Sequence, residues 1–220
     1  MQRNIYLAVE GVIGVGKTTL ARLLKPSFQA GLLLEVFEEN PFLSDFYTDR
    51  ARYAFQTQIF FLLSRYQQQR HTVTRLLNDN VYLIADYTFE KDALFAGINL
   101  QGDELDMYFR VHEALAEKIV VPDLIIYLRA DTDVLMQRIA MRDRPYERDM
   151  DRGYIHELNQ AYEDFFADRQ ERRSPVLALD TNELNYVRNE DDLRWVEERI
   201  RQALQLPPFQ RELPLQAAEG

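Results

Sequence analysis

The chain has 220 residues, 46% of them hydrophobic and 28% charged, which is enough to bury one sizeable core. It contains no cysteine, which excludes disulfide bonds, thiolate zinc sites and a cysteine nucleophile. Its formal net charge of −10 argues against a nucleic-acid polymer as partner, because such a partner needs a basic face. No apolar run approaches the roughly 18 residues of a membrane span, and residues 1–4 leave no room for a signal peptide, so we expect a cytoplasmic protein without a membrane partner.

Apolar runs and helix-like segments alternate along the chain. The apolar runs predict strands at 5–9, 32–34, 81–85, 124–128 and 176–179. Helical spacing or helix signals mark 19–24, 54–77, 104–120, 131–141, 152–169 and 191–204. Residues 41–53 are interpreted as turn-rich and 206–220 as a C-terminal tail. Because the runs are continuous rather than alternating, they predict an α/β fold in one domain over 1–205, with a five-stranded parallel sheet covered by helices on both faces.

The segment directly after the first strand fits the phosphate-binding pattern G-x-x-x-x-G-K-S/T. Its residues are Gly11, Val12, Ile13, Gly14, Val15, Gly16, Lys17 and Thr18, with Thr19 next in the helix. A glycine-rich turn at a helix N-terminus directs backbone N–H groups at phosphate oxygens. Lys17 is expected to reach the outer phosphates and the Thr18 hydroxyl to ligate Mg²⁺. The segment therefore predicts a site for a nucleoside triphosphate.

Polar residues follow three of the other predicted strands. The second strand ends at Glu35, the third at Asp86 and the fourth at Arg129. Because ligands of parallel sheets bind beyond the carboxyl ends of the strands, we expect these residues to face the triphosphate. The alternative for Glu35 or Asp86 is a cap on the following turn or helix.

Arginines are concentrated at the end of the helix predicted at 131–141. Arg138 and Arg142 share one helix face, and Arg144 follows. Guanidinium groups suit phosphate binding and charge neutralisation during phosphoryl transfer, so we predict a phosphate-closing lid at about 142–152. The alternative is a solvated charged face paired with Glu147, Asp149 and Asp151.

Together these segments resemble the deoxyribonucleoside kinases, and most closely the bacterial purine deoxynucleoside kinases. The resemblance spans about residues 5–185 and rests on the phosphate-binding loop, Glu35, Gln58, the Asp86-Tyr87-Thr88 motif and the Arg142-Asp143-Arg144 segment. It implies transfer of a phosphoryl group from ATP, with Mg²⁺ at Thr18 and Asp86, to the 5′-hydroxyl of a deoxyribonucleoside in nucleotide salvage. It also implies a homodimer formed through the helices at 54–77 and 104–120.

The same resemblance assigns roles to individual residues. Glu35 is the implied base, and Lys17, Asp86, Arg142 and Arg144 complete the catalytic set. The sugar 3′-hydroxyl is assigned to Tyr47 and Glu147, and the nucleobase to Gln58, with Arg65 and Asp92 lining the same pocket. Asp86, Tyr87 and Lys91 are assigned to the substrate site as well. Arg138 joins the lid, and Asp180 and Asn182 are placed by the ATP adenine.

One position departs from the family pattern. Many relatives carry arginine directly after the strand-three acid, where this chain has Tyr87. If residues 87–95 begin a helix, Lys91 lies one turn beyond Tyr87 and can supply the missing cation near the substrate. The alternative is a surface Lys91 paired with Asp92 or Glu90.

Other functions on the same fold compete with this one. A thymidylate-type nucleotide kinase needs arginines to hold its acceptor phosphate, whereas the segment after strand two offers Glu35, Glu38 and Glu39. A GTP-dependent switch or P-loop regulator needs an N-K-x-D motif, and Leu128-Arg129-Ala130-Asp131 stands at that place. Gln58 presents both a donor and an acceptor, so it is compatible with adenine, guanine or cytosine. A deoxycytidine-preferring or broad-specificity kinase is therefore the alternative to a purine kinase.

Overall fold

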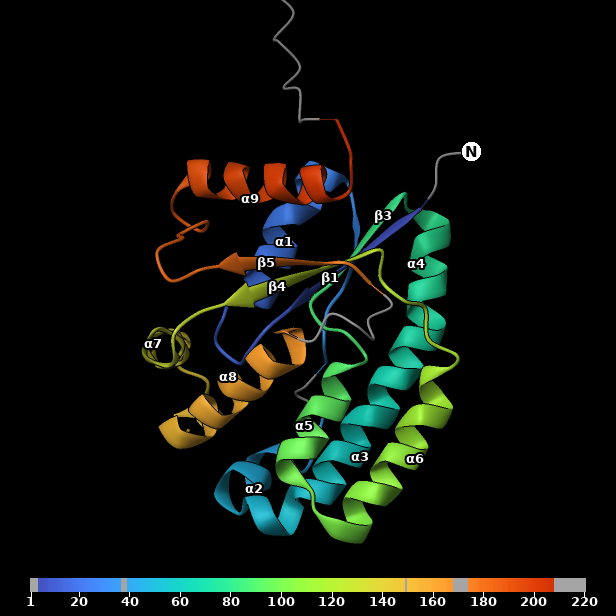
Figure 1. The fold of residues 1–220 in the computed structure, drawn as a ribbon, viewed down its shortest axis with the longest axis vertical. Helices are drawn as coiled ribbons and strands as arrows, with labels where there is room; N and C mark the ends of the chain where they lie inside the picture. Colours follow the sequence, from blue (N-terminus) through green and yellow to red (C-terminus); the bar gives the residue numbers. More distant parts are fainter. Residues whose placement is uncertain (1–3, 37–38, 149, 168–173, 208–220) are drawn as a thin grey trace, which may run out of the picture.

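A computed structural model describes residues 4–36, 39–148, 150–167 and 174–207. Its centre is a parallel five-stranded sheet with the order β2-β3-β1-β4-β5 (Figure 1). The strands are β1 (Ile5–Glu10), β2 (Gly31–Leu33), β3 (Tyr82–Ala85), β4 (Leu124–Arg129) and β5 (Val176–Asp180). The expected α/β fold is confirmed, and the order places β1, with the loop that follows it, at the middle of the sheet.

Helices form most of the connections between the strands. They are α1 (Lys17–Phe28), α2 (Leu43–Thr48), α3 (Arg50–Gln68), α4 (Thr74–Asp79), α5 (Lys91–Asn99), α6 (Gly102–Ala116), α7 (Thr132–Arg142), α8 (Arg152–Ala167) and α9 (Glu190–Ala203). Helices α1 and α9 lie on one side of the sheet, and α8, α5 and α3 lie on the other (Figure 1). No helix among the described residues is long and apolar enough to cross a membrane.

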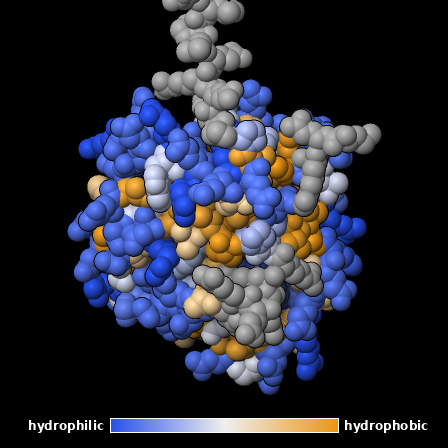
Figure 2. All heavy atoms as spheres, turned by 45° about the horizontal axis from the view of Figure 1, so that its top comes forward, coloured by the Kyte–Doolittle hydropathy of each residue, from blue (hydrophilic) through white to orange (hydrophobic). Residues whose placement is uncertain are grey.

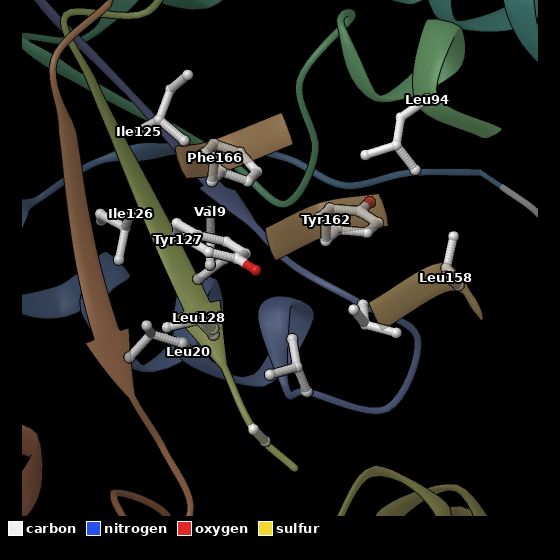
Figure 3. Packing of buried hydrophobic residues seen from close by; sticks show 14 of the residues in the cluster. Val9, Leu20, Leu94, Ile125, Ile126, Tyr127, Leu128, Leu158, Tyr162 and Phe166 are labelled. Carbon is white, nitrogen blue, oxygen red and sulfur yellow. The ribbon is translucent and has the colours of Figure 1, made fainter. Parts of the chain in front are cut away.

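Successive residues of the central strand contribute to different parts of the core. Leu7 and Val9 belong to the main core, where Val9 lies near Leu20 of α1 (Figure 3). Tyr6 belongs to a second cluster, which contains Leu83 and Tyr87. This division follows from the period of two in a strand, which turns successive side chains to opposite faces.

Aromatic rings hold α8 against the sheet. Tyr127 of β4 stacks on Phe166 with ring centroids 4.0 Å apart, and Tyr162 lies beside both (Figure 3). Stacked aromatic side chains bury large apolar areas, so this cluster holds α8 in place on its face of the sheet.

The region before β3 is more helical than the sequence indicated. The segment 41–53, expected to be turns, contains α2, and α3 already begins at Arg50. The side chain of Asp49 accepts a hydrogen bond from the Arg52 amide and caps α3, which places the start of the helix four residues before the expected one. A π-helical turn, η1 (Gln69–Val73), joins α3 to α4.

Other boundaries differ by smaller amounts, with one consequence for Lys91. Strand β2 ends at Leu33, two residues before Glu35, and α6 covers Gly102–Ala116 rather than 104–120. The helix expected from Tyr87 begins only at Lys91, because Tyr87 is buried in the second cluster and Thr88 bonds to β1 instead. Residues 168–169 of the expected fifth helix, Asp149 of the expected lid and 208–220 of the expected tail lie outside the described residues.

The face of the molecule in Figure 2 is mostly hydrophilic, with hydrophobic residues in separate patches between charged ones. This distribution agrees with a charged fraction of 28% and a net charge of −10.

Candidate active site

The phosphate-binding loop has the backbone conformation that its glycines allow. Gly11 has φ +142°, and a Cβ there would lie 2.4 Å from the carbonyl oxygen of Leu128. Gly14 has φ +88°, and a Cβ there would lie 2.7 Å from Ile139. Both positions therefore require glycine. The Lys17 ammonium donates to the carbonyl oxygens of Gly11 at 2.7 Å and Val12 at 3.1 Å.

A cleft open to solvent, with an empty space of about 700 Å³, lies beside this loop. Its walls come from the phosphate-binding loop and α1, from the segments after β2 and β3, and from α2, α3 and α5. The end of α7 and the segment that follows it, which includes the short 3₁₀ helix η2 (Pro145–Glu147), complete them. The lining side chains are Ile13, Lys17, Thr18, Glu35, Leu43, Tyr47, Gln58, Phe61, Arg65, Asp86, Lys91, Phe95, Arg142, Arg144, Tyr146 and Glu147. The structure thus brings together most of the residues that the sequence assigned to catalysis and substrate binding.

Asp86 connects the phosphate-binding loop to the segment after β2. Its Oδ2 accepts a hydrogen bond from the Thr18 hydroxyl at 2.5 Å, and its Oδ1 accepts one from the Glu35 backbone N–H at 2.7 Å. The Thr18 hydroxyl and the Asp86 carboxylate are oxygen ligands of the kind that Mg²⁺ prefers. Asp86 is therefore more than a cap on the following turn, because its two oxygens join two different loops.

Two cations hold the Glu35 carboxylate. Arg65 of α3 donates to Oε1 through Nε, at 2.9 Å, and through Nη2, while Lys91 of α5 donates to Oε2 at 2.7 Å. Arg65 also pairs with the buried Asp92 through Nη1. Burial would raise the pKa of Glu35, but the charges and hydrogen bonds of Arg65 and Lys91 outweigh it and hold the pKa well below the usual range.

Lys91 is buried and lies in the cleft, so the alternative of a surface lysine is wrong. It is the first residue of α5, and its side chain reaches the Glu35 carboxylate, which Arg65 of α3 also contacts. Its charge also acts on Lys17: burial, and next the repulsion from Lys91, lower the pKa of Lys17 to about 8.

A further carboxylate of the cleft lining, Glu147, is buried and paired with two arginines. Arg142 donates to it at 2.6 Å and 2.5 Å, and Arg144 lies 3.6 Å from its Oε1. The ring of Tyr47 from α2 stacks on that of Tyr146, with centroids 6.3 Å apart and an angle of 8° between the planes. Burial raises the pKa of Tyr47 well above its ordinary value, so its hydroxyl stays protonated and can donate.

Gln58 is the polar group of α3 that the sequence assigned to the nucleobase. It is buried and lines the cleft, and its Oε1 has no hydrogen-bond partner among the described residues. Phe61 and Phe95 line the cleft with it. A buried amide oxygen without a partner inside a cleft is suited to a ligand that can donate to it.

Several residues assigned to the site lie elsewhere. Tyr87 does not line the cleft, because its side chain is buried in the second cluster and its hydroxyl donates to Gln68 at 2.6 Å. Its expected contact with substrate is therefore wrong. Arg129 pairs with Glu163 at 2.7 Å and is half-exposed, so it does not face the loop as expected. Asp92 does not line the cleft, and it is paired with Arg65, which does.

Arg138, Asp180, Asn182 and Thr19 were assigned to ATP but do not line the cleft. Arg138 donates to both oxygens of Thr181 and to the carbonyl oxygen of Val15. Asn182, in the loop after β5, accepts from the Asp131 amide at 2.8 Å, and Asp180 accepts from the Asn182 amide. Thr19 is exposed in the first turn of α1.

Sequence reasoning missed Glu10 and the aromatic walls of the cleft. Glu10 was visible only as an acid at the end of an otherwise apolar run. Phe61 and Phe95 were visible as members of apolar patterns, which do not distinguish a cleft wall from a core.

A phosphate-binding loop at the centre of a parallel sheet, with a carboxylate beside its threonine and an adjoining cleft, defines a P-loop nucleotide-binding protein. Residues 7–205 match the family model described as deoxynucleoside kinase. The chain is 32% identical over 201 residues to the deoxyguanosine kinase of Bacillus subtilis, covering 90% of this chain and 97% of that protein. It is 33% identical over 183 residues to a deoxyadenosine kinase of Dictyostelium discoideum, covering 81% of this chain and 73% of that one.

The fold is also found in a solved structure. The deoxyadenosine kinase from M. mycoides with bound dCTP superposes with a TM-score of 0.76 at 22% identity, over 90% of this chain and all of that one. The chain belongs to the deoxynucleoside kinase family. It is a kinase that transfers a phosphoryl group from a nucleotide to a deoxynucleoside, which decides against the P-loop regulator and the thymidylate-type kinase.

Proposed function

We propose that this kinase uses ATP and Mg²⁺ to phosphorylate the 5′-hydroxyl of a purine deoxynucleoside. The observation that carries the proposal is the position of Glu35. Its backbone N–H donates a hydrogen bond to Asp86, and Asp86 also accepts one from Thr18 of the phosphate-binding loop. Through these hydrogen bonds Glu35, the proposed proton acceptor, lies beside the phosphate-binding loop. The purine preference is supported by the deoxyguanosine and deoxyadenosine kinases to which the chain is similar.

At the phosphate end, Lys17 and the backbone of residues 11–18 would bind the triphosphate. Thr18 and Asp86 would hold Mg²⁺, with phosphate oxygens and water as further ligands. The metal, when bound, neutralises charge on the phosphate oxygens as the phosphoryl group moves. Lys17 would exchange its two carbonyl contacts for phosphate oxygens, which are stronger acceptors for a cation.

At the acceptor end, Glu35 would accept the hydrogen bond of the nucleoside 5′-hydroxyl. Because its pKa is held low, Glu35 stays ionised and available as an acceptor throughout the physiological pH range. The proton passes to Glu35 as negative charge leaves the hydroxyl oxygen for the phosphoryl group. Arg65 and Lys91 keep the carboxylate aimed into the cleft.

The remainder of the cleft would select the nucleoside. Tyr47 and Glu147 would bind the 3′-hydroxyl, because both line the cleft and both carry polar groups suited to a hydroxyl. Gln58 would bind the nucleobase through its unpartnered Oε1 and its amide nitrogen. Since Gln58 suits adenine, guanine and cytosine alike, deoxycytidine remains the second candidate substrate.

Two larger features complete the proposal. The segment 142–152 would close over the phosphates as a lid, since Arg142 and Arg144 line the cleft with side chains about one third exposed. Two chains would pair through α3 and α6, which lie side by side (Figure 1) and expose Leu63 and Met107.

A coupled ADP-release assay over the four deoxynucleosides and their 5′-monophosphates, with ATP and Mg²⁺, tests the proposal. We expect the highest kcat/KM for deoxyguanosine or deoxyadenosine and no turnover of monophosphates. Lys17→Ala serves as the inactive control. A higher kcat/KM for deoxycytidine or thymidine would overturn the purine assignment, and turnover of a monophosphate would overturn the acceptor class.

A further inference from the structure

A fully buried carboxylate lies under the phosphate-binding loop without a role in the chemistry described so far. Glu10 is the last residue of β1, directly before Gly11, and none of its surface is exposed. It does not line the cleft. A buried carboxylate is costly unless hydrogen-bond donors compensate for its lost hydration, so its partners indicate what it does.

Four donors converge on Glu10, one from the adjacent Gly11 and three from the distant residues Thr88 and Tyr162. Its Oε2 accepts from the Gly11 backbone N–H at 2.9 Å and from the Tyr162 hydroxyl at 3.0 Å. Its Oε1 accepts from the Thr88 backbone N–H at 2.8 Å and from the Thr88 hydroxyl at 3.4 Å. Each carboxylate oxygen therefore binds one backbone N–H, and the two N–H groups follow the neighbouring strands β1 and β3.

The two loops joined in this way carry the groups of the phosphate site. The carbonyl oxygen of Gly11 accepts from the Lys17 ammonium, and Thr88 lies two residues beyond Asp86, which is bonded to Thr18. The third partner, Tyr162, belongs to the aromatic cluster of α8 and β4 (Figure 3). Glu10 thus ties the start of the phosphate-binding loop to the Asp86 loop and anchors both to the rigid core.

We propose that Glu10 is a positioning residue for phosphoryl transfer, which sets the spacing between the Lys17–Thr18 end of the phosphate-binding loop and Asp86. The proposal rests on the proposed function, because that spacing serves the binding of Mg²⁺ and ATP. A carboxyl group with two acceptor oxygens can accept from donors on two segments at once, which suits a group that must fix two loops. Residues behind the direct ligands of a metal commonly control its binding in this way.

The arrangement requires a carboxylate rather than an amide. In Glu10→Gln, one of the two oxygens becomes an NH₂ group, which is a donor. In either orientation of the amide, this donor faces a backbone N–H, of Gly11 or of Thr88, and neither N–H can reverse its role. The Tyr162 hydroxyl can rotate and accept from the amide. The hydrogen bond that is lost is therefore one to a loop, at Gly11 or Thr88, rather than the one to α8.

The test compares Glu10→Gln with Tyr162→Phe, which removes one donor but keeps both backbone contacts, and with Glu163→Gln, a change of equal charge on α8 outside the junction. Each variant is measured for thermal unfolding, for kcat and the KM of both substrates, for the Mg²⁺ concentration at half-maximal rate, and for binding of ATP with and without Mg²⁺ by calorimetry. Binding of the nucleoside alone reports on the other end of the cleft.

We expect Glu10→Gln to lower kcat and to weaken Mg²⁺-dependent ATP binding by about 10- to 100-fold. Nucleoside binding should stay within about twofold, because none of the side chains assigned to the sugar and the base, Tyr47, Gln58 and Glu147, contacts Glu10. Tyr162→Phe should lower kcat and Mg²⁺-dependent ATP binding by a smaller factor, and Glu163→Gln should keep the Mg²⁺ requirement of the wild-type protein. If Glu10→Gln does not fold, Glu10→Asp replaces it, because its shorter side chain cannot reach both N–H groups.

A folded Glu10 variant with wild-type kcat and Mg²⁺ requirement, but a lower Tm, would overturn the proposal and leave Glu10 a stabilising residue only. Equal loss of nucleoside and ATP binding would overturn it as well, because a general distortion would then be the cause. Failure of the proposed function is a separate result, since it would show as absence of kinase activity in the wild-type protein.

Discussion

Two carboxylates in the cleft, Glu35 and Glu147, are each held by two cations, yet the two clusters are built differently. Glu35 is paired with Arg65 and Lys91, which come from α3 and α5 and are only 6% and 7% exposed. Glu147 is paired with Arg142 and Arg144, which lie five and three residues before it and are 32% and 31% exposed. The Glu35 cluster is therefore assembled by the fold, and the Glu147 cluster by one local segment.

The difference indicates which cluster can move. Arg65 and Lys91 belong to α3 and α5, which the Arg65–Asp92 pair joins directly, so the cations that hold Glu35 are a fixed part of the scaffold. The ion pairs of the Glu147 cluster lie within residues 142–147, from the last residue of α7 to η2, so this cluster can shift as a unit with that segment. Partly exposed arginines also exchange a carboxylate for a phosphate at lower cost than buried ones. We therefore expect variants of the first cluster to affect the chemical step at a fixed geometry, and variants of the second to affect closure.

The largest effect is expected at Glu35. Glu35→Gln should lower kcat roughly 10²-fold or more, because the amide cannot take the proton of the 5′-hydroxyl, while nucleoside binding persists. Steady-state kinetics and calorimetric binding of the nucleoside measure both quantities. Glu39→Gln, an exposed acid in the same segment, is the control. Near-wild-type turnover of Glu35→Gln would remove it from the mechanism.

The lid arginines should come next. Arg142→Ala and Arg144→Ala should each lower kcat about 10²-fold with a smaller change in ATP affinity, because a cation aimed at the moving phosphoryl group acts mainly in the transition state. Arg148→Ala, which removes an exposed arginine paired with Asp143, is the matched control. If calorimetry shows a loss of ATP binding with the chemical step intact, the arginines are ground-state clamps and the two clusters differ less than we infer.

A substrate analogue tests Glu147 as a ligand of the sugar. A 2′,3′-dideoxynucleoside should lose about 1–3 kcal/mol in kcat/KM, because Tyr47 and Glu147 would keep buried polar groups without their partner. In Glu147→Gln the difference between the two substrates should shrink, since the carboxylate is gone. Equal kcat/KM values with and without the 3′-hydroxyl in the wild-type enzyme would contradict the assignment.

Lys91 should matter less than Glu35, because Arg65 also holds the carboxylate. Lys91→Ala should lower kcat about tenfold, as expected for the loss of one of two charge-assisted contacts to a positioned group. Lys91→Arg should retain part of the activity, since the cation is kept. Full activity of Lys91→Ala would leave Arg65 as sufficient support for Glu35.

The smallest expected effect is a change in the proton uptake that accompanies ATP binding, not a change in rate. Because the pKa of Lys17 is lowered to about 8, part of the Lys17 population is neutral at pH 8. A bound triphosphate favours the charged ammonium, so ATP binding at pH 8 should take up protons. Calorimetry in buffers of different ionisation enthalpy measures this uptake. Lys91→Ala removes a repelling charge and raises the pKa of Lys17, so the uptake should fall; an unchanged uptake would show that Lys91 does not act on Lys17.

The amino-acid sequence determined the parallel α/β fold and the phosphate-binding loop. Continuous apolar runs specify strands buried on both faces, and the spacing of Gly11, Gly16 and Lys17 specifies a local turn whose geometry needs no distant partner. Glu35 and Asp86 were placed correctly in the cleft, because the ends of parallel strands meet at one edge of the sheet. Arg129 also ends a strand, but its side chain does not line the cleft, because it donates to Glu163 of α8 instead.

Only the tertiary structure decided which side chains meet across elements. Tyr87 was assigned to the substrate, but its side chain is buried and its hydroxyl donates to Gln68. Because Tyr87 is buried in this way, α5 begins only at Lys91. Lys91 then reaches Glu35, 56 residues earlier in the chain. The junction at Glu10 likewise joins residues 11, 88 and 162. Local spacing fixes the conformation of a segment, whereas contacts of this kind depend on where helices and strands far apart in the sequence pack against each other.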